Sequence, residues 1–191
     1  ECAGECDAVG PEVANFAVGD AVCALLAGGG YAEAVVVPAG QVRPLPPGLT
    51  MTEAAAIPEV FATAYLNLYM EGAATPGERF LVHAGASGVG TAAIQLGRLF
   101  SNPVAVTLSG AAKAERCIAL GAEAAFDRGA EDFWPQIEAW AGPQGVDVIL
   151  DPVGGAYLEG NMKVVAVDGR LVIIGLMGGG SGHPGPGPHD G

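Results

Sequence analysis

From residue 79 to residue 175, short runs of Val, Ile and Leu alternate with amphipathic segments of helix-forming residues. Near-continuous apolar strands separated by helices are typical of a parallel sheet covered on both faces. Crossovers between parallel strands are right-handed, so the pattern predicts an α/β fold with a doubly wound, Rossmann-like parallel sheet. The five expected strands are RFLVHA, PVAVT, EAAFD, VDVILD and GRLVIIG, and GAYLEGNMKVVAV is the expected helix before the last of them.

The chain before this alternation has a different composition and pattern. Residues 1–50 contain short β-branched and apolar runs bounded by glycine and proline. Two of them, DAVCALL and YAEAVVVPA, predict strands, whereas the proline-rich VRPLPPGL predicts an extended connector. We therefore expect a β-domain over 1–50 and the α/β domain over 51–180. The Gly- and Pro-rich stretch 181–191 is expected to be a flexible tail.

Composition narrows the classes of partner. The 191 residues carry a formal net charge of −13, which disfavours nucleic acid and anionic membranes as general partners. The sequence contains no apolar run long enough to cross a bilayer. Its four cysteines form no C-x-x-C pair, which disfavours a zinc knuckle. We expect reduced thiols and a cytoplasmic location instead.

The stretch HAGASGVG, residues 83–90, joins the first apolar strand to an amphipathic helix. In a dinucleotide-binding turn, the first glycine permits a sharp turn, the second lets backbone N–H groups reach the pyrophosphate, and the third allows close packing. Gly85 and Gly90 hold the outer positions, and Ser87 replaces the middle glycine with a hydroxyl that can donate to phosphate. The stretch therefore predicts a cofactor site. A tight turn of small residues is the alternative.

The region after the second strand indicates which dinucleotide binds. NAD sites carry an acid about 20 residues past the glycines, whereas residues 106–113 contain none. Ser109, Gly110 and Lys113 suit a 2′-phosphate instead, so we expect NADPH rather than NADH. Arg128, after the third strand, is a second candidate for this region. The alternatives are a solvated Lys113 and a surface arginine.

Several blocks, in order, resemble the zinc-free quinone oxidoreductases of the medium-chain dehydrogenase/reductase superfamily, the zeta-crystallin-like group. The resemblance covers nearly all of residues 1–180. It implies part of a GroES-like β-domain over 1–50 and five of the six strands of a Rossmann domain, in a chain that is incomplete at both ends. The blocks are ECAGECDAVG, VGDAVCAL, GGGYAEAVVVPA, AAAIPEVFATAYLNL, GASGVGTAAIQL, LDPVGG and GRLVIIGLMGGG.

The resemblance also implies roles for single residues. Family members often have Tyr where Arg128 stands, which leaves open whether Arg128 stacks or pairs charge. Asp151 is expected to have a structural role at the end of its strand. Thr63 falls near the nicotinamide in the family, with helix packing as the alternative. The remaining expected cofactor contacts are Ser87, Gly88 and Val89 at the pyrophosphate, Val153 and Gly154 beside the ribose, and Gly175 and Leu176 near the nicotinamide.

The activity that the resemblance implies is hydride transfer from NADPH to a quinone. An enoyl or alkenal double-bond reductase is the alternative, and a truncated NADPH-binding protein without turnover is a third. The expected partners are a small quinone or enone and, for the full-length protein, a second copy of itself. We expect no metal, because CALLAGGG replaces the cysteine-rich lobe of the zinc-dependent relatives and Glu1 lacks a recognisable partner ligand. The catalytic residues are not identified, and this chain alone is expected to turn over little.

Overall fold

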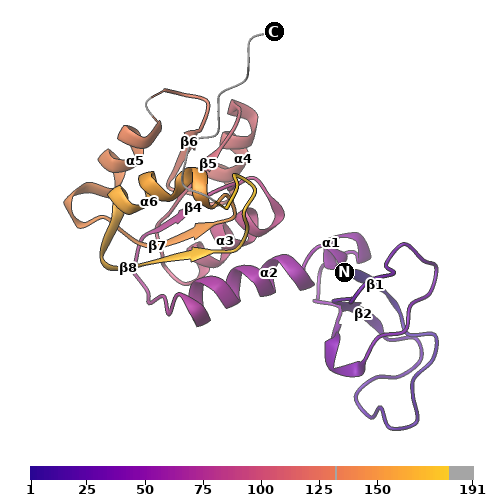
Figure 1. Cartoon of the computed structure of the whole chain (residues 1–191). Helices are drawn as coiled ribbons and strands as arrows, with labels where there is room; N and C mark the ends of the chain where they lie inside the picture. The colour runs from indigo at the N-terminus through magenta and orange to yellow at the C-terminus, as the bar shows by residue number, and fades with distance from the viewer. Residues whose placement is uncertain (132, 181–191) are drawn as a thin grey trace. The chain divides into compact units, whose positions relative to one another are not determined.

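The computed structural model describes residues 1–131 and 133–180 of the chain. It contains two compact units, Glu1–Ala62 and Thr63–Gly191 (Figure 1). The domain boundary expected at 50/51 stays a prediction, and the tail expected over 181–191 lies outside the described residues. Each unit is described by itself below.

The first unit is built on a small antiparallel sheet in the order β1-β2-β3. Its strands are β1 (Cys2–Glu5), β2 (Ala21–Ala24) and β3 (Val42–Pro44), with a 3-10 turn η1 (Ala39–Gln41) before β3. Helix α1 (Met51–Ala55) follows, and Thr50 caps it. The Thr50 hydroxyl accepts from the N–H of Glu53, and the Glu53 carboxylate accepts from the N–H of Thr50.

Two sequence expectations for this unit are wrong. YAEAVVVPA forms no strand, and Tyr31 and Val36 within it are fully exposed, so its apolar run has no surface to pack against. The connector VRPLPPGL instead supplies β3, which pairs with β2 at the edge of the sheet. Pro44 fits there because an edge strand does not need every N–H.

The second unit contains the expected parallel sheet, in the order β6-β5-β4-β7-β8. From β4 the chain builds outward through β5 to β6, then returns to the other side of β4 for β7 and β8. The order therefore reverses beside β4, which makes the carboxyl end of β4 the switch point of a doubly wound sheet. The strands are β4 (Phe80–Val82), β5 (Val104–Leu108), β6 (Ala124–Asp127), β7 (Val146–Asp151) and β8 (Val165–Ile173).

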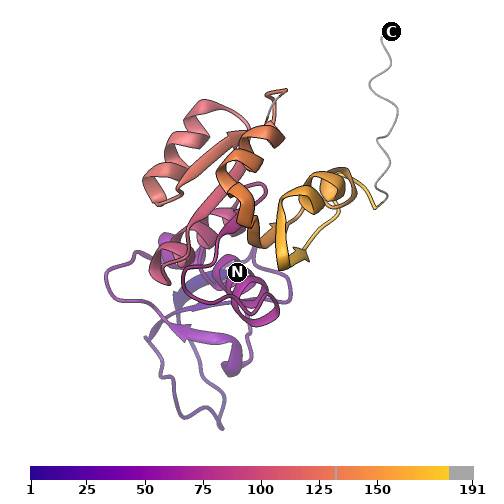
Figure 2. The ribbon, with the colours of Figure 1, turned by 90° about the vertical axis from the view of Figure 1, so that its left-hand side faces the viewer.

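Helices cover both faces of this sheet. Helices α3 and α4 pack on each other, as do α5 and α6, and the two pairs lie on opposite faces (Figures 1 and 2). The helices are α2 (Pro58–Tyr65), continued by the π-helical η2 (Leu66–Glu71), α3 (Gly88–Leu99), α4 (Ala111–Leu120), α5 (Phe133–Ala141) and α6 (Leu158–Val164), with 3-10 turns η3 (Gly142–Gln144) and η4 (Gly155–Tyr157).

Helix α6 is shorter than the sequence suggests. The expected helix ran to Val167, but α6 ends at Val164 and the chain continues directly as β8. The run from Val164 to Val167 is rich in β-branched residues, which favour extended backbone. Val165 pairs with Val146 on β7, and the register then shifts before the regular pairing resumes.

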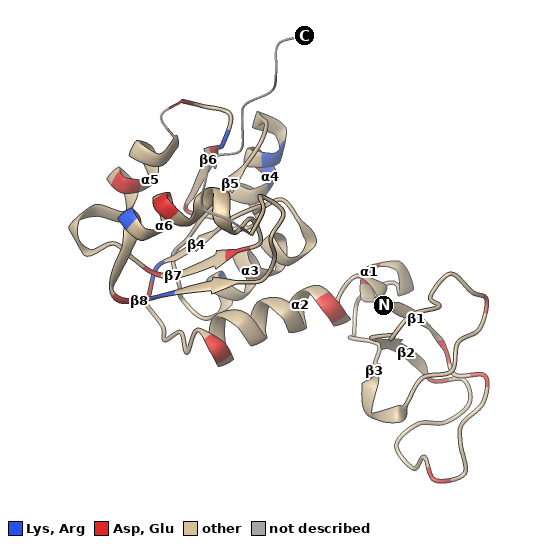
Figure 3. Cartoon of the chain, viewed as in Figure 1, with Lys and Arg blue, Asp and Glu red and all other residues tan. Residues whose placement is uncertain are grey.

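The sheet provides the core of the second unit. Strands β4 and β5 are buried along their whole length, and β7 nearly so. A bidentate ion pair fixes β8 to the segment before β4, with Arg170 nitrogens 2.8 Å from both carboxylate oxygens of Glu78. The sequence contains 21 Asp and Glu residues against 8 Lys and Arg, and acidic positions predominate along the ribbon (Figure 3).

Candidate functional site

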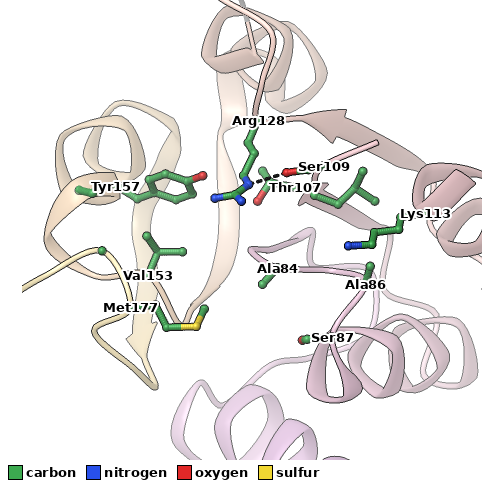
Figure 4. Close-up of a pocket in the computed structure, with 13 residues that line it drawn as sticks. Ala84, Ala86, Ser87, Thr107, Ser109, Lys113, Arg128, Val153, Tyr157 and Met177 are labelled. Carbon is green, nitrogen blue, oxygen red and sulfur yellow. Dashed lines mark hydrogen bonds between the residues drawn. The ribbon is translucent and has the colours of Figure 1, made fainter. Parts of the chain in front are cut away.

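A cavity of about 560 Å³ lies at the carboxyl ends of the central strands (Figure 4). Its volume falls within the range of small-molecule and cofactor sites. Its position at the switch point of the sheet is where open α/β sheets bind ligands. It is lined by Ala84, Ala86, Ser87, Thr107, Leu108, Ser109, Lys113, Arg128, Val153, Ala156, Tyr157, Met177 and Gly178.

The turn between β4 and α3 forms one wall of the cavity. Ser87 is the N-cap of α3, and its Oγ accepts from the N–H of Gly90 at 3.1 Å. The hydroxyl hydrogen of Ser87 remains available for a ligand. The N–H groups of Gly88 and Val89, in the first turn, have no acceptor within the helix. Together with the partial positive charge of the helix end, they suit an anion.

Close packing explains both outer glycines of this turn. A Cβ on Gly85 would lie 2.3 Å from the Cβ of Val106 on β5. A Cβ on Gly90 would lie 2.6 Å from the backbone of Gly85. Gly85 lets the turn lie against β5, and Gly90 lets the helix lie against the turn. These are the contacts that the motif requires of its first and last glycines.

Two cations reach the cavity from the ends of neighbouring elements. Lys113 lies on the first turn of α4, and Arg128 directly follows β6. Both side chains point into the cavity in Figure 4. The Arg128 Nε donates to the Ser109 hydroxyl at 2.6 Å, which joins the ends of β5 and β6. This side of the cavity therefore has the charge to hold a phosphate.

Asp127, the last residue of β6, holds the backbone of this side. Its carboxylate accepts from the N–H of Gly110 at 3.2 Å and from the N–H of Gly129 at 2.9 Å. These two bonds hold the pKa of Asp127 below its usual value. The acid thus fixes the turns that carry Ser109 and Arg128.

The opposite side is formed by the loop after β7 and the segment after β8. Burial raises the pKa of Tyr157, and the positive charge of the nearby Arg128 opposes this rise. Main-chain bonds hold the segment after β8 on the loop: Met177 N–H donates to Pro152 O at 3.2 Å and Gly178 N–H to Val153 O at 2.7 Å. The Leu176 and Met177 side chains stay largely exposed, at 61% and 72%.

Beneath the cavity lies a buried polar network. His83 Nδ1 is 2.9 Å from Thr107 Oγ1, and its Nε2 is 2.7 Å from Asn161 Oδ1. Asn161 Nδ2 donates to Asp151 Oδ2 at 2.9 Å. Asp151 Oδ1 accepts from the N–H groups of Val153 and Gly154, at 2.6 and 3.1 Å. This arrangement fits the structural role expected of Asp151 at the end of β7.

The sequence-predicted residues fall into three groups. Ser87, Ser109, Lys113, Arg128 and Val153 line the cavity together. A second group adjoins the cavity without lining it. In the turn before α3 and in its first residues, these are Gly85, Gly88, Val89 and Gly90, and Gly110 follows Ser109. The others, Gly154, Gly175 and Leu176, pack on one another next to Val153.

Thr63 is not among the residues that line this cavity. It lies on α2, where its carbonyl accepts from the Asn67 side chain at 2.8 Å. The family-based role near a nicotinamide remains a prediction.

Sequence reasoning missed several lining residues. Thr107 stands one residue inside the end of β5, and the polar residue at the end of a buried strand was the available signal. No sequence signal marks Tyr157 and Met177 as lining residues, because the sheet order brings them to the cavity from far along the chain. The other lining residues it missed are Ala84, Ala86, Leu108, Ala156 and Gly178.

Potential metal ligands are dispersed. Within residues 1–131 and 133–180, no three His, Cys, Asp or Glu side chains gather where they could hold a metal ion. The carboxylate of Glu1 accepts from the N–H of Glu59 at 2.8 Å, at the start of α2. The same part of the chain contains no helix of sufficient length and apolarity to span a bilayer.

Comparison with protein-family models gives two matches. Residues 1–47 match the model described as "Alcohol dehydrogenase GroES-like domain". Residues 88–185 match the model described as "Zinc-binding dehydrogenase". The first match covers the antiparallel sheet, and the second begins at α3.

Individual proteins show the same similarity. The "Synaptic vesicle membrane protein VAT-1 homolog" of Danio rerio is 34% identical over 175 residues, which is 92% of this chain and 36% of that protein. The CurK enoyl reductase structure is 34% identical, with a TM-score of 0.85 over 93% of this chain and 53% of that one. A quinone oxidoreductase of Pseudomonas syringae pv. Tomato DC3000 is 32% identical, with a TM-score of 0.81 over 94% and 55%.

One further solved structure contains a cofactor. It is a mycobacterial protein in complex with NADPH, 31% identical, with a TM-score of 0.84 over 96% of this chain and 58% of that one. The chain thus spans between about a third and three fifths of the length of these relatives.

Proposed function

This chain belongs to the medium-chain dehydrogenase/reductase superfamily, and from that premise we propose that it is the cofactor-binding part of a zinc-independent, NADPH-dependent quinone oxidoreductase. The fold is that of a nicotinamide-dinucleotide-binding member of the superfamily. The observation that supports NADPH most directly is the pair of cations, Lys113 and Arg128, in the cavity at the ends of β5 and β6.

The residues present fit this cofactor. The α3 N-terminus, with Ser87, Gly88 and Val89, suits the pyrophosphate. Small residues keep that wall open, and Ser109, Gly110 and Lys113, with Arg128 beside them, suit the 2′-phosphate. For the same cofactor we propose the family roles of the remaining residues. Val153 and Gly154 would lie at a ribose, and Thr63, Gly175 and Leu176 near the nicotinamide.

When bound, the cofactor supplies the hydride, and the protein supplies position and electrostatics. In this chain the α3 end would neutralise the pyrophosphate, and Lys113 and Arg128 would neutralise the 2′-phosphate. The buried network below Val153 and Thr107 keeps both walls in place. The groups that contact the hydride acceptor are not assigned.

Zinc independence is supported by the chemistry of the first unit. One cysteine follows the VGDAV segment, without the cluster of cysteines typical of a structural zinc lobe. The acid at the family's glutamate position, Glu1, bonds the backbone at the start of α2. Neither feature indicates a set of zinc ligands.

An enoyl or alkenal double-bond reductase is the second candidate function, and the similarity to the CurK enoyl reductase favours it. Both reactions use the same cofactor site and differ in the acceptor. A truncated NADPH-binding protein without turnover is the third candidate. We further propose a small quinone or enone as substrate, a homodimer as the full-length form, and a cytoplasmic location.

NADPH titration followed by steady-state assays tests these proposals. NADPH fluorescence should saturate on binding to the 191-residue chain, with NADH binding more weakly. The full-length enzyme should then oxidise NADPH faster with a quinone than with an α,β-unsaturated ketone. The reverse preference would support the reductase alternative, and tight binding without oxidation by either acceptor would support the non-catalytic one. Failure to bind either cofactor would refute the proposed function.

A further inference from the structure

Strand β8 forms one edge of the parallel sheet in the second unit (Figure 1). It is the longest strand of that sheet, with nine residues, and its one neighbour is β7. Within residues 1–131 and 133–180, no strand pairs with its other side. The open side of an edge strand carries a row of N–H and C=O groups, and such a row is a template for a further strand.

The register with β7 identifies the peptide groups that face outward. Ile173 lies opposite Asp151, and the N–H of Ile174 donates to Asp151 O at 2.9 Å. Successive peptide groups of a strand point to opposite sides, so the N–H and C=O of Val172 also face β7. The N–H and C=O groups of Leu171 and Ile173 therefore face the open side.

This stretch of β8 lacks the features that usually protect an edge strand. Protected edges are short, or they carry lysine, proline or a bulge. Residues 170–173 pair regularly with β7 and contain neither lysine nor proline, and the register shift of β8 lies before them. The opposite edge of the sheet, β6, has four residues in all. Of the two edges, β8 is therefore the one suited to pairing.

The charges around β8 are balanced, although the chain as a whole is strongly acidic. Helix α6 and β8 together contain two acids and two bases. Lys163 pairs with Glu159 at 2.9 Å, and Arg170 pairs with Glu78 at 2.8 Å. Two copies can therefore meet along this edge without the repulsion expected of a chain with a net charge of −13.

Apolar side chains on and beside β8 are exposed. On the strand itself, Val167 is 94% exposed and Ile173 is 50% exposed. Met162 on α6 and Met70 on η2 are exposed as well, and both of these elements pack against β8. Exposed apolar side chains on adjoining elements are a feature of protein interaction sites.

A two-fold axis beside Val172 matches the outward groups of β8 to those of a second copy. In an antiparallel pairing centred there, Leu171 lies opposite Ile173 of the second copy, and the reverse pair follows by symmetry. Each of these pairs can exchange two N–H···O bonds. Val172 meets its own counterpart, and Arg170 meets Ile174 of the second copy, so no like charges lie opposite each other.

We propose that the 191-residue chain forms a homodimer through β8, in which the two β8 strands pair antiparallel and join the two parallel sheets into one. Both copies contribute the same segment, so the contact is isologous and the assembly closes at two copies. The inference goes beyond the proposed function, because the pairing needs neither a cofactor nor a hydride acceptor.

Sedimentation equilibrium over a concentration series measures the mass of the wild-type chain in solution. We expect the mass to rise from that of one chain to that of two. A chain that stays monomeric over the whole series, or one that assembles beyond two copies, would overturn the proposal. A dimer that forms only when residues 181–191 are removed would assign the edge to that segment and would overturn it as well.

Ile173→Pro tests the outward peptide groups. It removes one outward N–H from each copy and spares the bonds to β7, and proline is tolerated on the solvent side of an edge strand. The variant should fold and dimerise at least roughly tenfold more weakly, because two hydrogen bonds are lost per dimer. The control, Ile173→Val, retains the N–H and should dimerise like the wild type. Wild-type dimerisation of Ile173→Pro would contradict the pairing.

Cysteine cross-linking tests the register. Val172→Cys places two thiols opposite each other at the axis, where Cα atoms about 4.5 Å apart lie within disulfide range. Ile173→Cys places them on a diagonal of about 7–8 Å, which is too long for a disulfide. Oxidation with copper(II) phenanthroline in air should therefore cross-link Val172→Cys and leave Ile173→Cys largely monomeric on a non-reducing gel.

Both cysteine variants are made in a chain that carries Cys2→Ser and Cys6→Ser, because the other two native cysteines are buried. Efficient cross-linking of Ile173→Cys, or none of Val172→Cys, would overturn the register. If Ile173→Pro does not fold, the mass of the wild-type chain and the cross-linking pattern decide the question. None of these measurements requires NADPH, so their failure leaves the proposed function intact, and failure to bind NADPH leaves the dimer intact.

Discussion

At the scale of single residues, Lys113 carries the cofactor preference. It is one of two lysines in the chain, and it lies beside Ser109 in the cavity. Lys113→Ala should weaken NADPH binding about tenfold to a hundredfold, because it removes a charge-assisted phosphate contact, and should leave NADH binding little changed. Fluorescence titration with both cofactors measures this difference.

The other lysine provides a matched control. Lys163 pairs with Glu159 on the exposed side of α6, at 2.9 Å, and does not line the cavity. Lys163→Ala removes the same charge from the chain and should alter neither dissociation constant. Equal effects of the two lysine variants, or an equal loss of NADPH and NADH binding in Lys113→Ala, would refute the 2′-phosphate assignment.

Ser87 links stability to binding, because one hydroxyl caps α3 and faces the cavity. Ser87→Ala should lower the free energy of unfolding by about 1 kcal/mol and weaken NADPH and NADH alike. Ser87→Gly should lower the stability by only a few tenths of a kcal/mol. Chemical denaturation and cofactor titration of both variants measure the two effects. Full stability in Ser87→Ala would contradict the capping role.

The sequence identified residues near the turn and the end of β5 that line the cavity. Ser87 lies within the glycine-rich turn, and Ser109 and Lys113 follow the next strand along the chain. The local order of strands and turns therefore indicates that these residues lie close together. The same order does not indicate Tyr157 and Met177, because their approach depends on β7 returning to the side of β4.

At the scale of elements, the attachment of β8 depends on the pair of Arg170 and Glu78. The bonds from Arg170 lower the pKa of Glu78. A lowered carboxyl pKa contributes stability above its unfolded value, about 4.5, and that stability is lost as the pH falls through the folded value. The wild-type chain should therefore lose stability below about pH 4.5 partly through this pair.

Glu78→Gln tests this contribution. The variant should lose about 1–2 kcal/mol of unfolding free energy at pH 7 and should lack the part of the acid dependence due to Glu78. Urea denaturation from pH 7 to pH 3 measures both. The control is Glu159→Gln, which removes an exposed helix pair and should change stability little. Parallel pH profiles for wild type and Glu78→Gln would contradict the assignment.

The elements also show where sequence patterns fail. The five apolar runs of the α/β unit are all strands. Each is buried between helices, and its apolar composition is the sequence signal of that burial. YAEAVVVPA has a similar composition but no partner, whereas Val42–Pro44 becomes a strand by pairing with β2. Strand formation at those two places depends on distant backbone, which local composition does not record.

At the scale of the whole molecule, the cavity is a small cationic site on a chain with a net charge of −13. Cofactor binding to the folded chain should stabilise it by mass action. NADPH at 100 times its dissociation constant should add about 2.7 kcal/mol to the free energy of unfolding. Thermal melts over a concentration series measure this, with an equal concentration of NADH giving a smaller shift. A melting temperature independent of NADPH would contradict binding to the native state.

The main-chain bonds between the segment after β8 and the loop after β7 have a consequence for how such a pocket can diversify. The wall is built from peptide groups, from Met177 to Pro152 and from Gly178 to Val153, while the Met177 side chain is 72% exposed and lines the cavity. Substitutions at Met177 can alter the shape and chemistry offered to a ligand while the wall itself keeps its backbone. Met177 is therefore the natural site for a randomised library that aims to change ligand selectivity within an unchanged cofactor fold.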